Sequence, residues 1–243
     1  MSGEAGNFSG STGTRVIKVA AIVAAAGRGD RLGGNTPKAL VELAGRPLMA
    51  WSLAALAASK AVEQIVIAAP DGYEEEIAAV AREAASELST DVVAGGESRS
   101  RSVANGLGAV AGAAIVVVHD AARPLVTAEL VDKSVSQLER WGCDAVIAAA
   151  RATDTIKEAG AGGRVTATLE RSSLWAVQTP QTFRVEALRK AVDASELDRA
   201  YDDAQLVEAI GGDVRIVESS RDNLKITTPF DLRVAELLLE ERS

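Results

Sequence analysis

Short apolar segments recur along this chain, and each is followed by a loop and then by a stretch with helical spacing. The apolar segments lie at 16–26, 64–70, 89–96, 113–124 and 144–150. Helices are expected between them at 47–59, 73–88, 98–110 and 127–140. The nearly continuous apolar character is typical of strands buried on both faces. The alternation therefore predicts βαβ units and an α/β fold, with a mostly parallel sheet that carries helices on both faces.

Residues 151 to 174 interrupt this rhythm. Two short, Thr-rich, polar-alternating segments are joined there by GAGG, which predicts a projecting β-hairpin arm. Residues 174–183 return to the core, and the chain then continues with helices over 184–194 and 202–211, a strand over 213–219 and a helix over 228–241. Residues 1–14 are rich in Ser and Gly and predict a flexible tail. We expect one domain over 15–243.

Composition limits the possible functions. The 243 residues carry a net charge of −8, and aromatic residues make up only 3%. The acidic charge argues against nucleic acid or an anionic membrane as a partner. The low aromatic content argues against a base-stacking platform for nucleic acid. Cys143 is the only cysteine and His119 the only histidine. Zinc sites built from His and Cys are therefore excluded, Cys143 is expected in the core, and a reducing cytoplasm is the expected compartment.

Three loops are expected to meet beyond the carboxyl ends of the strands: 26–38, 95–102 and 119–124. The first follows the apolar segment ending at Ala26 and reads GRGDRLGGNTPK. Gly27 and Gly29 allow an anion-binding backbone turn, and Arg28, Arg31 and Lys38 add cations. The loop lacks G-K-[ST] and misses G-x-G-x-x-G by one residue. A triphosphate clamp and a plain solvated turn both remain open.

The segment VVVHDAARP places polar residues at the end of the clearest buried strand. Asp120 is well placed there for a metal ion or a substrate hydroxyl, although it could instead cap the following turn. Arg123 is a candidate phosphate donor. His119, in the last strand position, is expected to be a hydrogen-bonded structural residue.

Motifs along the whole chain then point to one family. AAAGRGDRLGGNTPK, GGESRSRSV, VVVHDAARP, ATDTIK, LERSS, QTPQ and DNLKIT occur in this order. From residue 17 onward the chain resembles the 2-C-methyl-D-erythritol 4-phosphate cytidylyltransferases of the non-mevalonate isoprenoid pathway. The first motif is shared by many nucleotidyltransferases, whereas VHDAARP with TPQ and NLKIT is narrower. The resemblance implies a Rossmann-like sheet of the nucleotidyltransferase type.

The resemblance also implies roles for individual residues. Arg31, Lys38 and Lys225 match the catalytic cations on the phosphates. The implied nucleotide-binding residues are Ala25, Ala26, Gly27, Gly29, Gly96, Ser102 and Asp120. The implied substrate-binding residues are Asp120, Ala121, Arg123, Thr155, Arg171 and Thr179. Thr155 and Arg171 lie on the arm, which in the family reaches into the neighbouring subunit's site.

Further expectations follow from the same resemblance. Mg²⁺ is expected as cofactor, held mainly through the phosphates of CTP with Asp120 as its one protein ligand. A homodimer formed by arm exchange is expected as well. Two positions depart from the family pattern, since Glu97 stands where Asp is common and Tyr201 replaces a Thr. Two alternatives remain: a cytidylyltransferase for another polyol phosphate such as ribitol 5-phosphate, and a nucleotide-sensing module without turnover.

Overall fold

The strands of the predicted α/β fold assemble into one seven-stranded sheet. The computed structural model describes residues 19–27, 29, 32 and 36–242. The predicted tail, Arg28 and Arg31 lie outside these residues. Within them the strand order is β11-β7-β10-β6-β1-β4-β5. These strands are β1 (Val19–Ala24), β4 (Val62–Ala69), β5 (Ser89–Ala94), β6 (Ile115–Asp120), β7 (Ala145–Arg151), β10 (Trp175–Arg184) and β11 (Val214–Glu218).

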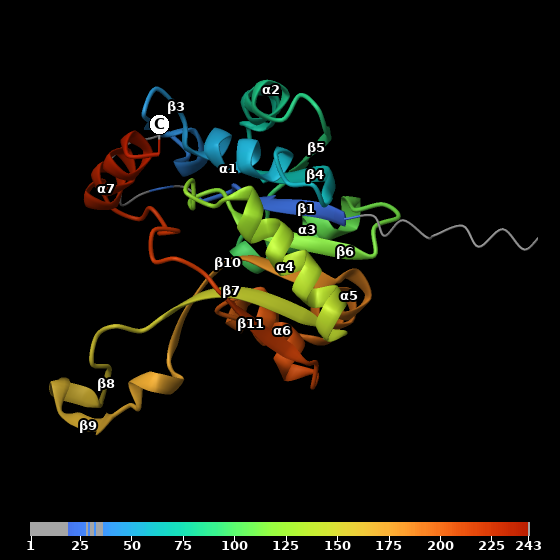
Figure 1. Cartoon of the computed structure of the whole chain (residues 1–243). Coiled ribbons are helices and arrows are strands. Elements are labelled where there is room, and N and C mark those ends of the chain that lie inside the picture. Colours follow the sequence, from blue (N-terminus) through green and yellow to red (C-terminus); the bar gives the residue numbers. More distant parts are fainter. Residues whose placement is uncertain (1–18, 28, 30–31, 33–35, 243) are drawn as a thin grey trace, which may run out of the picture.

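Helices cover both faces of this sheet, as the apolar pattern predicts (Figure 1). In β1, Ala21 and Val23 pack with helices α1 (Leu48–Ala57), α2 (Glu74–Ala84) and α4 (Ala128–Trp141). Ala20 and Ile22 point to the other face, toward α3 (Arg99–Ala109), α5 (Val185–Ala194) and α6 (Asp203–Ala209). Because successive strand residues face opposite sides, a continuous apolar run fills two cores at once. The predicted doubly covered sheet is therefore confirmed.

The last helix, α7 (Pro229–Glu240), packs away from the two main cores. Its buried residues join Leu43, Leu48 and Leu125 in a third apolar cluster. A Thr228–Asp231 capping box and Pro229 start the helix. This packing holds the segment before α7, which contains Lys225, against the carboxyl edge of the sheet.

Strand β10 is the one departure from parallel pairing among the seven strands described. It lies between β7 and β6 and is antiparallel to both. The cause is the arm, which leaves the carboxyl edge of the sheet after β7 and returns at the same edge. A chain that returns without a crossover helix must run back antiparallel. The pairing with β7 is interrupted between Val177 and Gln181, and this irregularity redirects the side chains of the QTPQ motif.

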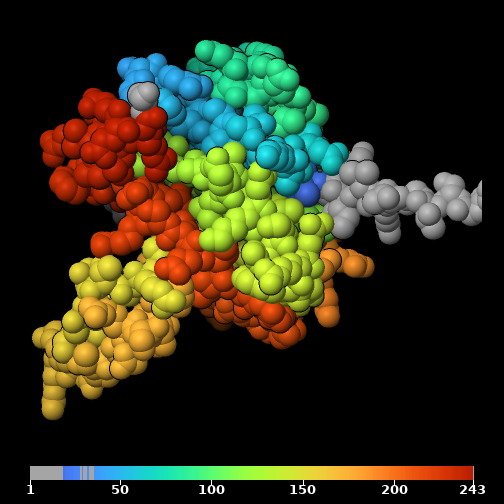
Figure 2. Space-filling model, in the orientation of Figure 1, coloured from blue at the N-terminus to red at the C-terminus, as the bar shows by residue number. Residues whose placement is uncertain are grey.

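The predicted arm is present as a separate antiparallel hairpin. Its strands are β8 (Lys157–Ala159) and β9 (Val165–Thr168), accompanied by the short helices η3 (Ala161–Gly163) and η4 (Arg171–Ser173). Figure 2 shows the arm standing clear of the rest of the molecular surface. Ile156, Val165 and Leu169 on it are 39%, 55% and 38% exposed. A two-stranded hairpin of this kind is marginally stable when it packs on nothing else.

A second small hairpin, β2 (Glu42–Leu43) and β3 (Arg46–Pro47), has no counterpart in the sequence-based prediction. Its turn places Ala44 and Gly45 at φ values of 48° and 77°. Turns of this kind usually contain Asn-Gly or Asp-Gly, so the Ala-Gly pair did not predict a hairpin here. The remaining short helices are η2 (Lys38–Leu40) and η5 (Leu197–Arg199). In the part of the chain that the structure describes, no helix is long and apolar enough to cross a bilayer.

Candidate active site

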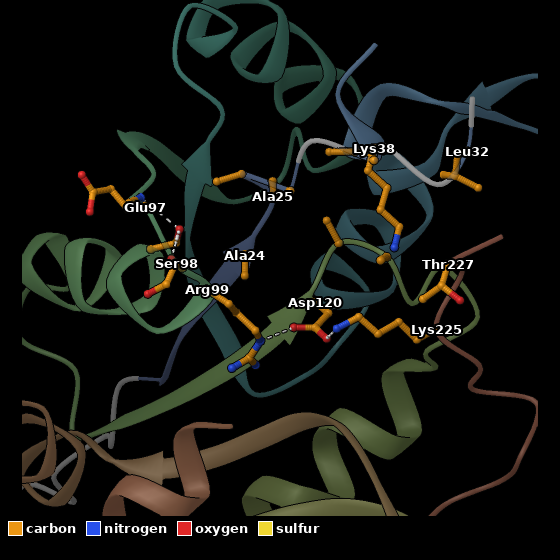
Figure 3. Close-up of a pocket in the computed structure, with 18 residues that line it drawn as sticks. Ala24, Ala25, Leu32, Lys38, Glu97, Ser98, Arg99, Asp120, Lys225 and Thr227 are labelled. Carbon is orange, nitrogen blue, oxygen red and sulfur yellow. Dashed lines mark hydrogen bonds and ion pairs between the residues drawn. The ribbon is translucent and has the colours of Figure 1, made fainter. Parts of the chain in front are cut away.

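A cavity of about 620 Å³ opens at the carboxyl ends of β1, β5 and β6 (Figure 3). All three predicted loops contribute to its lining, so their expected convergence is confirmed. The lining also takes in a fourth segment, from residues 225 to 227, which the strand order alone does not predict to lie here. The predicted site residues that line the cavity are Ala25, Ala26, Gly27, Gly29, Lys38, Gly96, Ser102, Asp120, Ala121 and Lys225.

The glycine loop brings Lys38 to the cavity. The amide of Lys38 donates a hydrogen bond to the carbonyl of Gly27 at 3.1 Å. Gly29 has φ of 77°, and a Cβ there would lie 3.0 Å from the Cβ of Lys38. A side chain at position 29 would therefore be strained and would press on Lys38. Figure 3 shows the Lys38 ammonium and that of Lys225 on the same side of the cavity.

Opposite this loop, the Gly95–Gly96 pair allows the start of α3 to approach β1. A Cβ on Gly95 would lie 2.4 Å from that of Ala26, so only glycine fits there. The Gly96 amide donates to Ser102 Oγ at 3.0 Å, and Ser102 Oγ donates to the carbonyl of Ser98 at 2.9 Å. Glu97 lines the far end of the cavity from the two lysines (Figure 3).

Asp120 is the electrostatic centre of the cavity. Its Oδ1 lies 2.7 Å from Arg99 Nε and its Oδ2 lies 2.8 Å from Lys225 Nζ. Burial would raise the pKa of this carboxyl, but the charges of Arg99 and Lys225 outweigh it and hold the pKa far below its ordinary value. Asp120 is therefore a permanent anion that orients two cations, one of them beside Lys38.

Arg99 and Asp203 belong to this charged group although the sequence-based prediction omits them as site residues. Arg99 Nη1 lies 2.7 Å from Asp203 Oδ2. Burial opposes the charge of Arg99, but Asp120 and Asp203 raise its pKa above the ordinary arginine value. For Asp203 burial prevails over the attraction of Arg99 and raises the pKa. The signal available in the sequence was an arginine that opens a helix three residues after the glycine pair, beyond a strand end.

Thr179 contacts β6 rather than the cavity. Its Oγ1 accepts a hydrogen bond from the amide of Asp120 at 3.0 Å and lies 3.0 Å from His119 Nδ1. His119 Nε2 lies 3.2 Å from the carbonyl of Arg123. A carbonyl only accepts, so Nε2 carries the proton and Nδ1 accepts from the Thr179 hydroxyl. This series of hydrogen bonds fixes the backbone of Asp120, and the predicted structural role of His119 is confirmed.

The stability of the protein should fall as the pH drops from about 6.5 toward 4, because His119 is buried. Burial lowers its pKa to about 4 from the ordinary 6.5. A depressed folded-state pKa stabilises the fold above pH 6.5, and this stabilisation is lost as the pH falls toward 4. The slope contributed approaches about 1.4 kcal/mol per pH unit. Urea unfolding between pH 7 and 4.5 measures it.

The matched variant for this measurement is His119→Gln, whose amide still offers a donor to the Arg123 carbonyl. We expect lower stability at pH 7 but a flatter dependence on pH in the same window. Since this is the only histidine, the difference between the two slopes reports one group. Equal slopes in the two proteins would contradict the assignment.

Arg123 is buried behind the cavity instead of lining it. Its Nη1 donates to the carbonyl of Asn223 at 2.8 Å, and its Nη2 donates to that of Val177 at 3.4 Å. Burial lowers its pKa, although Asp120 counteracts this. Asn223 in turn donates to the Gln178 side chain and to the carbonyl of Thr179. Arg123 thus ties the NLKIT segment to the QTPQ segment, and in this arrangement it supports the position of Lys225.

The predicted arm residues do not meet the cavity of their own chain. Thr155 and Arg171 are exposed, and Arg171 Nη1 donates to the carbonyl of Thr153 at 2.9 Å. Tyr201 is 95% exposed. Arg31 lies outside the described residues. Cys143 is buried just before β7, at the end of the sheet opposite the cavity, as expected for a core residue.

A metal ion would find few protein ligands here. Among the described residues, no group of three or more His, Cys, Asp or Glu side chains could hold one. Both oxygens of Asp120 already face cations. The described residues fit an ion that is coordinated chiefly by a bound polyphosphate, with few carboxylates from the protein.

Comparison with known proteins identifies the family of this chain. The family model described as 2-C-methyl-D-erythritol 4-phosphate cytidylyltransferase (IspD) matches residues 19–241. A protein of that name from Frankia casuarinae is 46% identical over 91% of this chain and 81% of its own. Another, from Pelotomaculum thermopropionicum, is 44% identical over 93% and 95%. The crystal structure of the Thermus thermophilus 2-C-methyl-D-erythritol 4-phosphate cytidylyltransferase aligns with a TM-score of 0.75 and 32% identity, over 92% of this chain and all of that one. The chain therefore belongs to the IspD family of 2-C-methyl-D-erythritol 4-phosphate cytidylyltransferases.

Proposed function

We propose that this protein transfers CMP from CTP to the phosphate of 2-C-methyl-D-erythritol 4-phosphate. The products are 4-diphosphocytidyl-2-C-methyl-D-erythritol and pyrophosphate. The observation that carries the proposal is the cavity in which a glycine loop, Lys38 and Lys225 surround the ionised Asp120, in a chain of the IspD family. The alternatives, ribitol 5-phosphate as acceptor or nucleotide sensing without turnover, receive no support from the family match.

The chemistry needs charge neutralisation more than a protein nucleophile. An oxygen of the acceptor phosphate attacks the α-phosphorus of CTP, and the bond from that phosphorus to the bridging oxygen breaks as pyrophosphate leaves. Both reactants are anions, so alignment and electrostatic stabilisation lower the barrier. Lys38 and Lys225 enter the cavity from separate loops and would stabilise charge on the α-phosphate. Arg31 is proposed as a third cation. The attacking phosphate is already ionised, so no general base is required.

Backbone groups are proposed to recognise the nucleotide. Ala25, Ala26, Gly27 and Gly29 form one wall of the cavity, and Gly96 and Ser102 form the wall opposite. With no Cβ at the glycine positions, a planar base and a ribose can approach the main chain closely. Asp120 and Ala121 also line the cavity, and they are proposed to lie between the nucleotide and the acceptor.

Mg²⁺ is proposed as the cofactor. It favours phosphate oxygens with few carboxylates, and Asp120 is the one aspartate among the described residues that line the cavity. When bound, the ion would neutralise the triphosphate of CTP. The residues of the chain then position the phosphates, with Asp120 as the one candidate protein ligand.

The activity is tested by measuring pyrophosphate release from each nucleoside triphosphate, with and without each acceptor. We expect release only with CTP and 2-C-methyl-D-erythritol 4-phosphate in the presence of Mg²⁺. Release with ribitol 5-phosphate alone would reject the proposed acceptor. No release with any pair would favour a nucleotide sensor.

A homodimer that exchanges arms is also proposed. The arm projects from the body of the molecule (Figures 1 and 2), none of its described residues lines the chain's own cavity, and it carries exposed apolar side chains together with Thr155 and Arg171. In a two-fold dimer the arm of one subunit would deliver both residues to the acceptor end of the other subunit's site. Cytoplasmic location is proposed because the buried Cys143 is free.

Mixing two inactive variants tests the exchange. Arg171→Ala and Lys38→Ala should each be nearly inactive, since one lacks the arm contact and the other the phosphate contact. Mixed dimers would place an intact arm over an intact cavity in one of their two sites. After unfolding and joint refolding, about one quarter of wild-type activity should return for random pairing. Each variant refolded alone is the control. No recovery, or a monomer in sedimentation, would contradict arm exchange.

A further inference from the structure

Arg99 is the first residue of α3 and reaches from the rim of the cavity to its floor (Figure 3). Its guanidinium divides its donors between two carboxylates. Nε binds Asp120 at 2.7 Å and Nη1 binds Asp203 at 2.7 Å. A guanidinium beside a single carboxylate commonly binds both of its oxygens in a fork. Here Nε binds one oxygen of Asp120 while Nη1 is held by Asp203, and Lys225 takes the second oxygen of Asp120, so the fork does not form.

Asp203 is held in place by a part of the chain far from the glycine loop. It is fully buried at the first position of α6. The Gln181 side chain pins this helix start, since its Nε2 donates to Asp202 at 2.9 Å and its Oε1 accepts from the Ala204 amide at 3.3 Å. Asp203 Oδ1 has no hydrogen-bond partner among the described residues. A buried carboxyl with an unpaired oxygen is costly, so its place beside Arg99 calls for an explanation beyond stability.

The division of Arg99 has a consequence for Asp120. With one Asp120 oxygen bound by Arg99, the other stays available to Lys225 at 2.8 Å. Two carboxylates then alternate with two cations in the order Asp203, Arg99, Asp120, Lys225, so that their charges balance. If Asp203 were absent, Arg99 would be free to bind both oxygens of Asp120 and would compete with Lys225.

We propose that Arg99 is a positioning residue for the transfer reaction, and that Asp203 holds it so that Asp120 presents its second oxygen to Lys225. The proposal rests on the proposed function for the role of Lys225. Arg99 acts through Asp120, and Asp203 acts through Arg99. The QTPQ motif is thereby linked to the catalytic cations from two sides, since Thr179 fixes the backbone of Asp120 and Gln181 fixes the start of α6.

Kinetics of single and double variants test this order of action. Arg99→Gln and Asp203→Ala should each lower kcat by about 10- to 100-fold, with a smaller change in the KM for CTP. This is the range found when residues that orient metal ligands, without touching the metal, are replaced. Asp203→Asn keeps an oxygen acceptor for Arg99 and should recover most of the loss. The double variant should be no slower than Arg99→Gln alone. Arg101→Gln is the matched control, because Arg101 lies on the same helix in an exposed pair with Asp198, and it should keep wild-type kcat.

A kcat near wild type in Asp203→Ala, losses that multiply in the double variant, or a loss confined to the KM for CTP would each overturn the proposal. Crystal structures supply a readout that does not depend on activity. In Asp203→Ala we expect Arg99 to bind both oxygens of Asp120 and Lys225 to move away. An unchanged Lys225–Asp120 pair overturns the inference even if the wild type transfers CMP. If the wild type releases no pyrophosphate, the proposed function is rejected. The crystal structure of Asp203→Ala still confirms or contradicts the role inferred for Asp203 and Arg99.

Discussion

Replacing Lys38 by alanine is expected to lower kcat for CMP transfer by about 100-fold or more, the loss seen when one donor to a developing oxyanion is removed. Lys38 lines the cavity from the glycine loop, and its amide closes that loop on the carbonyl of Gly27. Alanine keeps the amide, so the loop should persist while the ammonium is lost. The negative charge that develops on the α-phosphate in the transition state then has one fewer cation to stabilise it.

The rate of pyrophosphate release at saturating CTP and acceptor measures this effect. Lys60→Ala is the matched control, because Lys60 is exposed and precedes β4 at the opposite edge of the sheet. Both variants should unfold at the same denaturant concentration as wild type within error. Turnover of Lys38→Ala close to wild type would remove the role proposed for Lys38.

Asp120→Asn is expected to lower kcat by about 100-fold as well, and it should also destabilise the fold. The amide has the shape of the carboxylate but no charge, so Arg99 and Lys225 lose their shared counter-ion. Without that anion Lys225 is no longer oriented toward the phosphates. Breaking a buried pair by removing one partner costs about 3 to 5 kcal/mol. The lower end applies here, because the side chains of Arg99 and Lys225 are 25% and 40% exposed.

Urea unfolding and kcat, measured on the same preparations, separate the two effects. Asp198→Asn is the control, since it neutralises an exposed carboxylate. Asp198 pairs with Arg101, which lies on α3 as Arg99 does. Exposed pairs contribute about 1 kcal/mol or less, so this variant should stay near wild type in both measurements. If Asp120→Asn behaved like Asp198→Asn, the electrostatic centre would lie elsewhere in the cavity.

The predicted residues of the nucleotide site lie together because their positions follow from local patterns. A buried strand ending in glycine places Ala25, Ala26, Gly27 and Gly29 at the carboxyl edge, and the same holds for Gly96 and Asp120 at the ends of their own strands. Parallel strands bring these ends together whatever the rest of the chain does. Lys225 needed the resemblance to the family, since it follows β11, a strand on the far side of the sheet from β1.

Other residues lie where no local pattern could place them. Thr179 and Arg123 belong to segments that the resemblance assigns to the acceptor, yet in this chain they brace β6 and the segment before Lys225. Arg99 and Asp203 are 104 positions apart and meet at 2.7 Å. Their pairing depends on which helix packs beside α3, and that is decided by core packing over the whole sheet.

The α/β class, the glycine loop and the edge of the sheet at which the polar loops converge were therefore predictable from the residues alone. These depend on the spacing of apolar residues and on glycine, which act over a few residues. The antiparallel direction of β10 and the position of Asp120 between Arg99 and Lys225 are known only from the three-dimensional fold. These depend on burial and on charges from distant segments, and a long-range contact leaves no periodic trace in the residues that make it.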